Sequence, residues 1–218
     1  MKIYENRIRY GHIPCNIDWT EPGAFYHVPP GFGGMPLIRV WENRILDLPE
    51  GSPLGNIRVP EGVRGENAER FRNAVLIAPA AFTNKGIPDS FWEKLAVALR
   101  KEGFDVYCNS GGLSYDKIIV GTTEYVSSTK ELIVNAPLFR HVIGVRSGFT
   151  DIVAKTGARM SVLHLGAPDD AVSRVEYGTR YDDVRDLGRM EGIFPVIRVP
   201  EKDEEVINLL LEDVLQNG

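Results

Sequence analysis

One short stretch of the sequence combines a basic side chain, a hydroxyl and two glycines where a predicted strand meets a predicted helix. The stretch is Gly144-Val145-Arg146-Ser147-Gly148. Ser147 is a suitable helix N-cap, and Gly148 leaves room for a ligand against the backbone. The free N–H groups of residues 148–150 and the guanidinium of Arg146 would together favour a phosphate. A capped helix beside a solvated arginine explains the same pattern without a ligand.

Polar residues also follow the other predicted strands. Thr83 and Lys85 come after the first strand and offer further phosphate donors. Asn109 comes after the second strand, and Thr122 and Thr123 follow the third, where they would contact a base or a ribose. Because ligands of parallel sheets bind at the carboxyl ends of the strands, we expect these residues near one edge. Each is equally typical of a polar loop, a turn or a helix cap.

The first turn of the helix that begins at Gly148 contains Asp151. A carboxylate suits the positive end of a helix, and this one is also placed to orient Arg146. Several familiar motifs are absent. No G-x-G-x-x-G follows the first strand, which disfavours a dinucleotide cofactor, and there is no G-x-x-x-x-G-K-[ST] phosphate loop. A hydrolase with Ser147 as nucleophile is also disfavoured, because G-x-S-x-G would need glycine at 145.

The cysteines and histidines show no metal-ligand spacing, so neither a metal nor another cofactor is predicted. His141 and His164 lie on or at the edge of predicted strands, where a structural role is favoured. Cys15 and Cys108 are far apart and are typical of reduced structural thiols in a cytoplasmic protein.

The pattern of elements from residue 72 onward alternates between strand and helix. Strands are predicted at 74–78, 104–108, 117–120, 141–145, 160–165 and 196–199. Capping boxes at Ser90–Glu93 and Ser128–Glu131 begin two helices, and two more are predicted at 148–156 and 204–215. Gly103 and Gly157 end helices. This alternation indicates an α/β fold: a Rossmann-like parallel sheet with helices on both faces.

The first part of the chain differs in composition. Residues 1–65 contain 9 Gly and 8 Pro, 17 in all, whereas the other 153 residues contain only 19. We expect residues 1–71 to form an irregular Gly/Pro-rich N-terminal segment and linker, and residues 72–218 to form the domain. The net charge of −5 argues against a nucleic-acid partner. No apolar run is long enough for a transmembrane segment, and no signal peptide is evident.

Three blocks of the sequence together resemble a known family. They are "VLIAPAAFTNKGIPDSFWEKLAVALRKEGFDVYCN", "GTTEYVSSTKEL" and "HVIGVRSGFTDIVAKTGARMSVLHL". They look like the C-terminal, nucleotide-sugar-binding half of bacterial glycosyltransferases with two Rossmann-like domains (the GT-B type). The likeness is to transferases of polysaccharide biosynthesis and, more distantly, to heptosyltransferases and fucosyltransferases. It implies metal-independent glycosyl transfer, in polysaccharide or glycoconjugate synthesis, from a UDP- or GDP-linked sugar.

The resemblance also assigns roles to residues. Arg146, Ser147 and Gly148 would face the pyrophosphate, and Thr83 and Lys85 the phosphates or the sugar. It implies that residues 1–71 are a remnant of an acceptor-side domain, so that a homodimer or an N-terminal-domain partner would complete the site. No catalytic residue is assigned, and the N-terminal candidates for a base are His12, Asp18, Glu21 and His27. The alternative is a non-catalytic nucleotide-binding or interaction subunit that keeps the same half-fold.

Overall fold

A computed structural model describes most of the chain from residue 67 onward. The described residues are 67–79, 87–109, 119–166, 170–177, 183–187 and 190–216, together with the backbone of 2–4 and 7–9. The strands β1 (Lys2–Tyr4) and β2 (Arg7–Arg9) pair antiparallel in a sheet of their own. The predictions for several residues lie outside the described part, namely those for His12, Cys15, Asp18, Glu21, His27, Thr83 and Lys85.

The main sheet has seven strands, of which six are parallel. The parallel strands are β3 (Ala74–Ala78), β4 (Asp105–Asn109), β5 (Thr123–Tyr125), β6 (His141–Val145), β7 (Met160–Leu165) and β9 (Ile193–Arg198). The short strand β8 (Ser173–Arg174) pairs antiparallel with β9 at one edge. The predicted fold class, a mostly parallel α/β sheet, is therefore confirmed.

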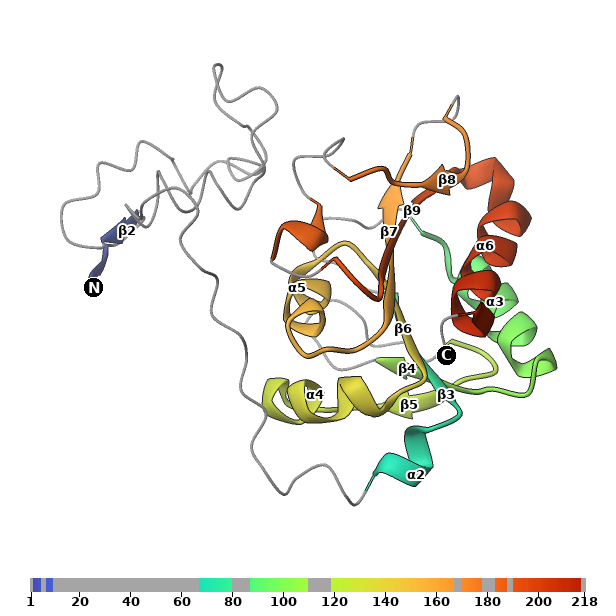
Figure 1. The fold of residues 1–218 in the computed structure, drawn as a ribbon, viewed down its shortest axis with the longest axis horizontal. Coiled ribbons are helices and arrows are strands. Elements are labelled where there is room, and N and C mark those ends of the chain that lie inside the picture. The colour runs from blue at the N-terminus through green and yellow to red at the C-terminus, as the bar shows by residue number, and fades with distance from the viewer. Residues whose placement is uncertain are drawn as a thin grey trace.

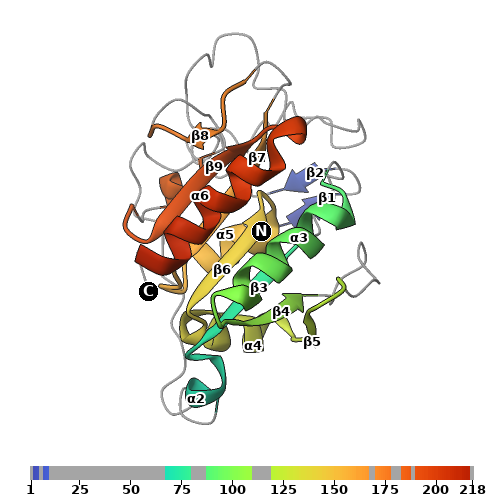
Figure 2. The same ribbon diagram turned by 90° about the vertical axis from the view of Figure 1, so that its right-hand side faces the viewer.

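Helices cover both faces of this sheet (Figures 1 and 2). The longer helices α3 (Asp89–Lys101) and α6 (Asp203–Gln216) pack on one face, and α4 (Thr129–Asn135) and α5 (Gly148–Ala154) on the other. The short helix α2 (Ala68–Phe71) precedes β3. Within the described residues, 3-10 helices span Ala136–Leu138, Val184–Leu187 and Pro200–Lys202.

Alternate strand residues supply the two halves of the core. In β3, for example, Val75 and Ile77 pack under α3 and α6, whereas Leu76 packs on the α4–α5 side. All five residues of β3 and of β6 are buried, as expected for strands covered on both faces. Phe71 of α2 also enters the core, where its ring stacks on Phe139 at 4.2 Å. The described packing thus begins at α2.

The order of the strands places a ligand-binding crevice. Across the sheet the order is β5-β4-β3-β6-β7-β9-β8. Without the antiparallel edge strand, this is the 3-2-1-4-5-6 order of a doubly wound Rossmann sheet. The chain reverses its direction of travel between β3 and β6, and ligands of such sheets bind outside the carboxyl ends of the strands at that point. The loops after β3 and β6 therefore flank the expected site.

The structure corrects several local predictions. Helix α3 begins at Asp89 after Pro88 with no side-chain cap, so the predicted Ser90–Glu93 capping box is wrong. The third strand is Thr123–Tyr125, and Ile119 and Val120 of the predicted strand lie outside it. The reason is a turn, in which Gly121 has a φ of +85° and Thr122 bonds back to Ile119. The Ser128–Glu131 capping box and the end of α3 at Gly103 are confirmed.

Candidate functional site

The junction of β6 and α5 forms as the sequence predicts, with a shorter helix. Ser147 is the N-cap of α5, and its N–H donates to Thr150 Oγ1 at 2.9 Å. Thr150 Oγ1 in turn donates to the Ser147 carbonyl oxygen at 2.7 Å. The opposite half of this capping box is weak, because Ser147 Oγ is buried without a partner of hydrogen-bond geometry. With seven residues, α5 has a small helix dipole, and the site must depend mainly on side chains and first-turn N–H groups.

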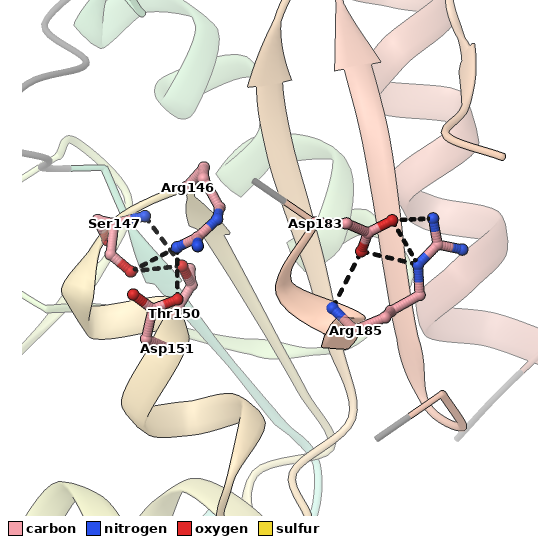
Figure 3. Close-up of polar contacts among 6 residues, drawn as sticks. All are labelled: Arg146, Ser147, Thr150, Asp151, Asp183 and Arg185. Atoms are coloured by element: carbon pink, nitrogen blue, oxygen red, sulfur yellow. Dashed lines mark hydrogen bonds and ion pairs between the residues drawn. The ribbon is translucent and has the colours of Figure 1, made fainter. Parts of the chain in front are cut away.

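Arg146 and Asp151 form an ion pair across the first turn of α5. Figure 3 shows the two side chains pointing toward one another, with Arg146 Nη1 donating to Asp151 Oδ1. The Arg146 side chain is 14% exposed and that of Asp151 39%. The prediction that Asp151 orients Arg146 thus agrees with the structure. The pair fixes the guanidinium at the carboxyl end of β6, beside the point where the strand order reverses.

The two glycines of the motif have different structural roles. A Cβ on Gly144 would lie 3.0 Å from Thr150 Cγ2 and 3.5 Å from the Ala78 Cβ, so this glycine lets α5 approach the sheet closely. A Cβ on Gly148 would meet no atom within 4 Å, and its φ is not in the left-handed region. The fold therefore requires no glycine at 148, which is consistent with a ligand that approaches the backbone there.

The other predicted residues are only partly brought to this edge. Asn109 is the last residue of β4 and half-buried at its carboxyl end. Thr122 and Thr123 instead lie at the start of β5, toward its amino end. The Thr122 hydroxyl donates to the Ile119 carbonyl oxygen at 2.7 Å. Their predicted place after the third strand is wrong, because that strand begins at Thr123.

Sequence reasoning missed a buried polar network near the amino ends of the parallel strands, opposite the candidate site. His141 Nε2 lies 2.8 Å from Ser161 Oγ, which donates to Asp213 Oδ2 at 3.1 Å. Arg174 of β8 donates to the Asp213 Oδ1 with its Nη2 at 2.7 Å. His141, Ser161 and Asp213 are fully buried. Burial, with Arg159 and Arg140 nearby, lowers the pKa of His141 to about 3. Burial also raises the pKa of Asp213 above its usual value.

Two further arginines were also missed. Arg185 donates to Asp183 and, through Nη2, to the Val175 carbonyl oxygen at 2.9 Å, and Figure 3 shows this pair apart from Arg146. Its donors thus serve to hold the chain before β9. Arg198, at the end of β9, is only 1% exposed. A single arginine in the otherwise apolar run Val196–Val199 was the available signal.

The described residues hold few other candidates for chemistry. Among them, no group of three or more His, Cys, Asp or Glu side chains is arranged to bind a metal ion. Cys108 is a buried free thiol, and burial raises its pKa to about 11. His164 is buried like His141, in line with a structural role. No described helix is both long and apolar enough to cross a membrane.

Comparisons with known proteins place the fold. No family model matches the chain, and no curated protein matches it in sequence. Among solved structures, it is similar to E. coli ADP-heptose LPS heptosyltransferase II, with a TM-score of 0.51 and 15% identity. The match covers 79% of this chain and 57% of that one, so the chain spans little more than half of that enzyme's length.

Two more solved structures are similar to the chain at a lower TM-score of 0.48. One is E. coli heptosyltransferase WaaC with ADP, at 12% identity over 69% of this chain and 48% of that chain. The other is the iron-containing dodecameric glycosyltransferase TibC of enterotoxigenic E. coli, at 15% identity over 85% and 55%. The likeness to heptosyltransferase II concerns the fold alone: the described α/β sheet resembles the matched part of that enzyme.

Proposed function

We propose that this domain binds the nucleoside diphosphate of a donor sugar for glycosyl transfer. The observation that carries the proposal is the position of Arg146. It follows β6 directly, beside the point where strand order reverses, and Asp151 holds it there. Next to it, Gly148 leaves the backbone open although the fold does not require a glycine. A cation and an accessible helix start at this crevice suit a diphosphate.

The chemistry proposed for this site needs no metal. Glycosyl transfer from a nucleotide sugar releases a nucleoside diphosphate, and preorganised donors stabilise the charge that develops on it. Arg146 and the first-turn N–H groups of α5 would supply these donors. Thr83 and Lys85, after β3, are proposed as further phosphate ligands, with Asn109 at the adjacent strand end. Thr122 and Thr123 are weaker candidates, since they lie at the start of β5.

The likeness in fold supports the class of ligand. The name of heptosyltransferase II includes ADP-heptose. We therefore add adenine to uracil and guanine as nucleotide bases to test. We propose that polysaccharide or glycoconjugate synthesis is the process served. A second copy of this chain, or a partner domain, would supply the acceptor side.

Binding of nucleoside diphosphates tests the proposal directly. We expect UDP, GDP or ADP to bind with micromolar-to-millimolar affinity in isothermal titration calorimetry. Arg146→Ala should weaken the best ligand by about 1.5–3 kcal/mol, as for hydrogen bonds to a charged group. Arg72→Ala is the matched control, because Arg72 is an exposed arginine whose ion pair is with Glu69 of α2. Equal affinity of wild type and Arg146→Ala would contradict the site.

Transfer itself is a separate prediction. Holding donor and acceptor together accounts for effective molarities of about 10⁵ M or more in well-oriented systems. If a second copy supplies the acceptor side, turnover per chain should rise with protein concentration, whereas donor affinity should not. Mass spectrometry of donor and acceptor mixtures at several protein concentrations measures this. Efficient turnover that is independent of concentration would show that one chain holds both substrates.

A further inference from the structure

Arg198 lies where three elements meet at the carboxyl edge of the sheet. It is the last residue of β9, and its Nη2 donates to Asp203 Oδ1, in the first residue of α6, at 2.7 Å. Its guanidinium carbon lies 5.0 Å from the centre of the Phe91 ring, in the first turn of α3. The side chain is 2% exposed. The charge is therefore held between the starts of two long helices.

Most of this guanidinium is left without hydrogen bonds. Nε and Nη1 are buried, and neither has a partner among the described residues. Burying an N–H group without a hydrogen-bond partner costs free energy, and the cost is larger when the N–H belongs to a charged group. Arg185 provides a contrast, because its Nε and Nη2 both donate to Asp183. Asp203 alone does not satisfy Arg198, whose unused donors suit an oxyanion.

The place of Arg198 relates it to the proposed ligand. Strands β6 and β9 flank β7, so their ends are about 10 Å apart at the usual strand spacing. Arg146 pairs with α5 on one face of the sheet, while Arg198 contacts α3 and α6 on the other. A ligand that crosses the carboxyl edge between these faces would lie near both arginines, and its binding must uncover the buried Nε and Nη1 of Arg198.

We propose that Arg198 binds a second oxyanion of the ligand that Arg146 binds. The oxyanion is either the phosphate farther from the nucleoside or a carboxylate on the transferred sugar. This inference rests on the proposed function and specifies its substrate: a donor with two separated anionic groups. Asp203 and Phe91 act as supports that hold the guanidinium in position.

Three variants separate binding from support. Arg198→Met removes the charge and keeps an unbranched side chain, and Arg198→Lys keeps the charge without the planar fork. Asp203→Asn removes only the supporting carboxylate. The readout is calorimetry with four ligands: a nucleoside monophosphate, the diphosphate, the diphosphate linked to an uncharged hexose, and the diphosphate linked to a hexuronate. Thermal melting is measured in parallel. The base is the one that binds best to the wild type.

We expect Arg198→Met to weaken the ligand that carries the second oxyanion by about 10- to 100-fold, and Arg198→Lys to weaken it less. Loss for every diphosphate, with the monophosphate unaffected, identifies the phosphate as the oxyanion. Loss for the hexuronate alone identifies the carboxylate. Asp203→Asn should lower the melting temperature and leave this selectivity intact, because the guanidinium keeps its charge and its unused donors.

Other results overturn the inference. Equal weakening of all four ligands by Arg198→Met, or no weakening of any, would make Arg198 a structural residue only. If Arg146→Ala abolishes binding and Arg198→Met does not change it, the proposed function stands and this assignment fails. If the wild type binds none of the nucleotides, both fail. Should Arg198→Met not fold, the same comparison is made with Arg198→Lys.

Discussion

Polar and charged side chains lie at both the carboxyl ends and the amino ends of the parallel strands, but in different environments. At the carboxyl edge, the Arg146–Asp151 pair is partly exposed beside a glycine that the fold does not need. At the amino edge, His141, Ser161 and Asp213 are completely buried. A serine, a histidine and an aspartate in contact suggest a hydrolase, but here the serine lies between the other two. The exposure of Arg146 and Asp151, rather than their residue types, distinguishes this candidate site from the buried network at the amino edge.

The amino-edge network has a clear mechanical role. Asp213 of α6 accepts hydrogen bonds from Ser161 of β7 and from Arg174 of β8. It therefore ties a helix to the interior of the sheet and to the edge strand. Buried polar groups of this kind stabilise only while all their partners are in place. We expect changes at this edge to affect stability without affecting ligand binding.

The largest effect is expected from Asp213→Ala. The change leaves Ser161 without its acceptor, releases Arg174 and opens a cavity, and should lower the free energy of unfolding by about 2–4 kcal/mol. Urea denaturation measures this. The control is Glu212→Ala, because Glu212 is half-exposed, lies 3.8 Å from the same arginine and should cost less than about 1 kcal/mol. Similar small losses in both variants would show that the buried contacts contribute little.

The next effect is a dependence of stability on pH that comes from His141. Its pKa is about 3 in the folded protein and 6.5 when unperturbed, so only the unfolded chain takes up a proton between these values. Its contribution is fully present above pH 6.5 and is lost as the pH falls, at about 1.4 kcal/mol per pH unit. At pH 4.5 the loss should reach about 2–3 kcal/mol.

Comparison with a variant isolates this contribution. His141→Gln should be less stable at pH 7 but should lose less stability between pH 6.5 and 4.5 than the wild type does. Asp213, whose pKa is raised, changes stability in the opposite sense, because burial makes its charged form less favourable in the folded protein than in the unfolded chain. Denaturation curves at several pH values measure how the stability of the wild type and of His141→Gln changes with pH. Parallel curves for the two proteins would mean that His141 can take up a proton without unfolding.

The smallest effects on stability are expected from substitutions of Gly144 and Gly148, the two glycines at the carboxyl edge. Gly144→Ala forces Thr150 and Ala78 apart and should cost about 1–3 kcal/mol of stability. Gly148→Ala meets no atom, so its stability should change by less than about 1 kcal/mol. Gly148→Val places a branched side chain where the ligand would touch the backbone and should weaken nucleotide binding far more than stability. Retained nucleotide affinity in Gly148→Val would move the ligand away from α5.

The sequence by itself determined the class of the fold and the position of the central motif. The continuous apolar run of β3 predicted that strand to the residue, because strands buried on both faces carry that pattern locally, and the predicted bounds of β6 and β7 were equally accurate. The Ser128–Glu131 capping box was equally readable, since its two hydrogen bonds join residues three apart. The ion pair of Arg146 with Asp151 joins residues only five apart, which is why spacing was enough to suggest it.

Only the tertiary structure decided the rest. The third strand escaped prediction because Thr123–Tyr125 is three residues long and depends on pairing with β4. Ser161 and Asp213 are 52 residues apart in the chain, and no local pattern brings them together. Arg198 belongs to a predicted strand, and only the fold brings Phe91 and Asp203 around it. Local periodicity fixes elements, whereas contacts between distant residues decide which polar groups are buried and which face a ligand.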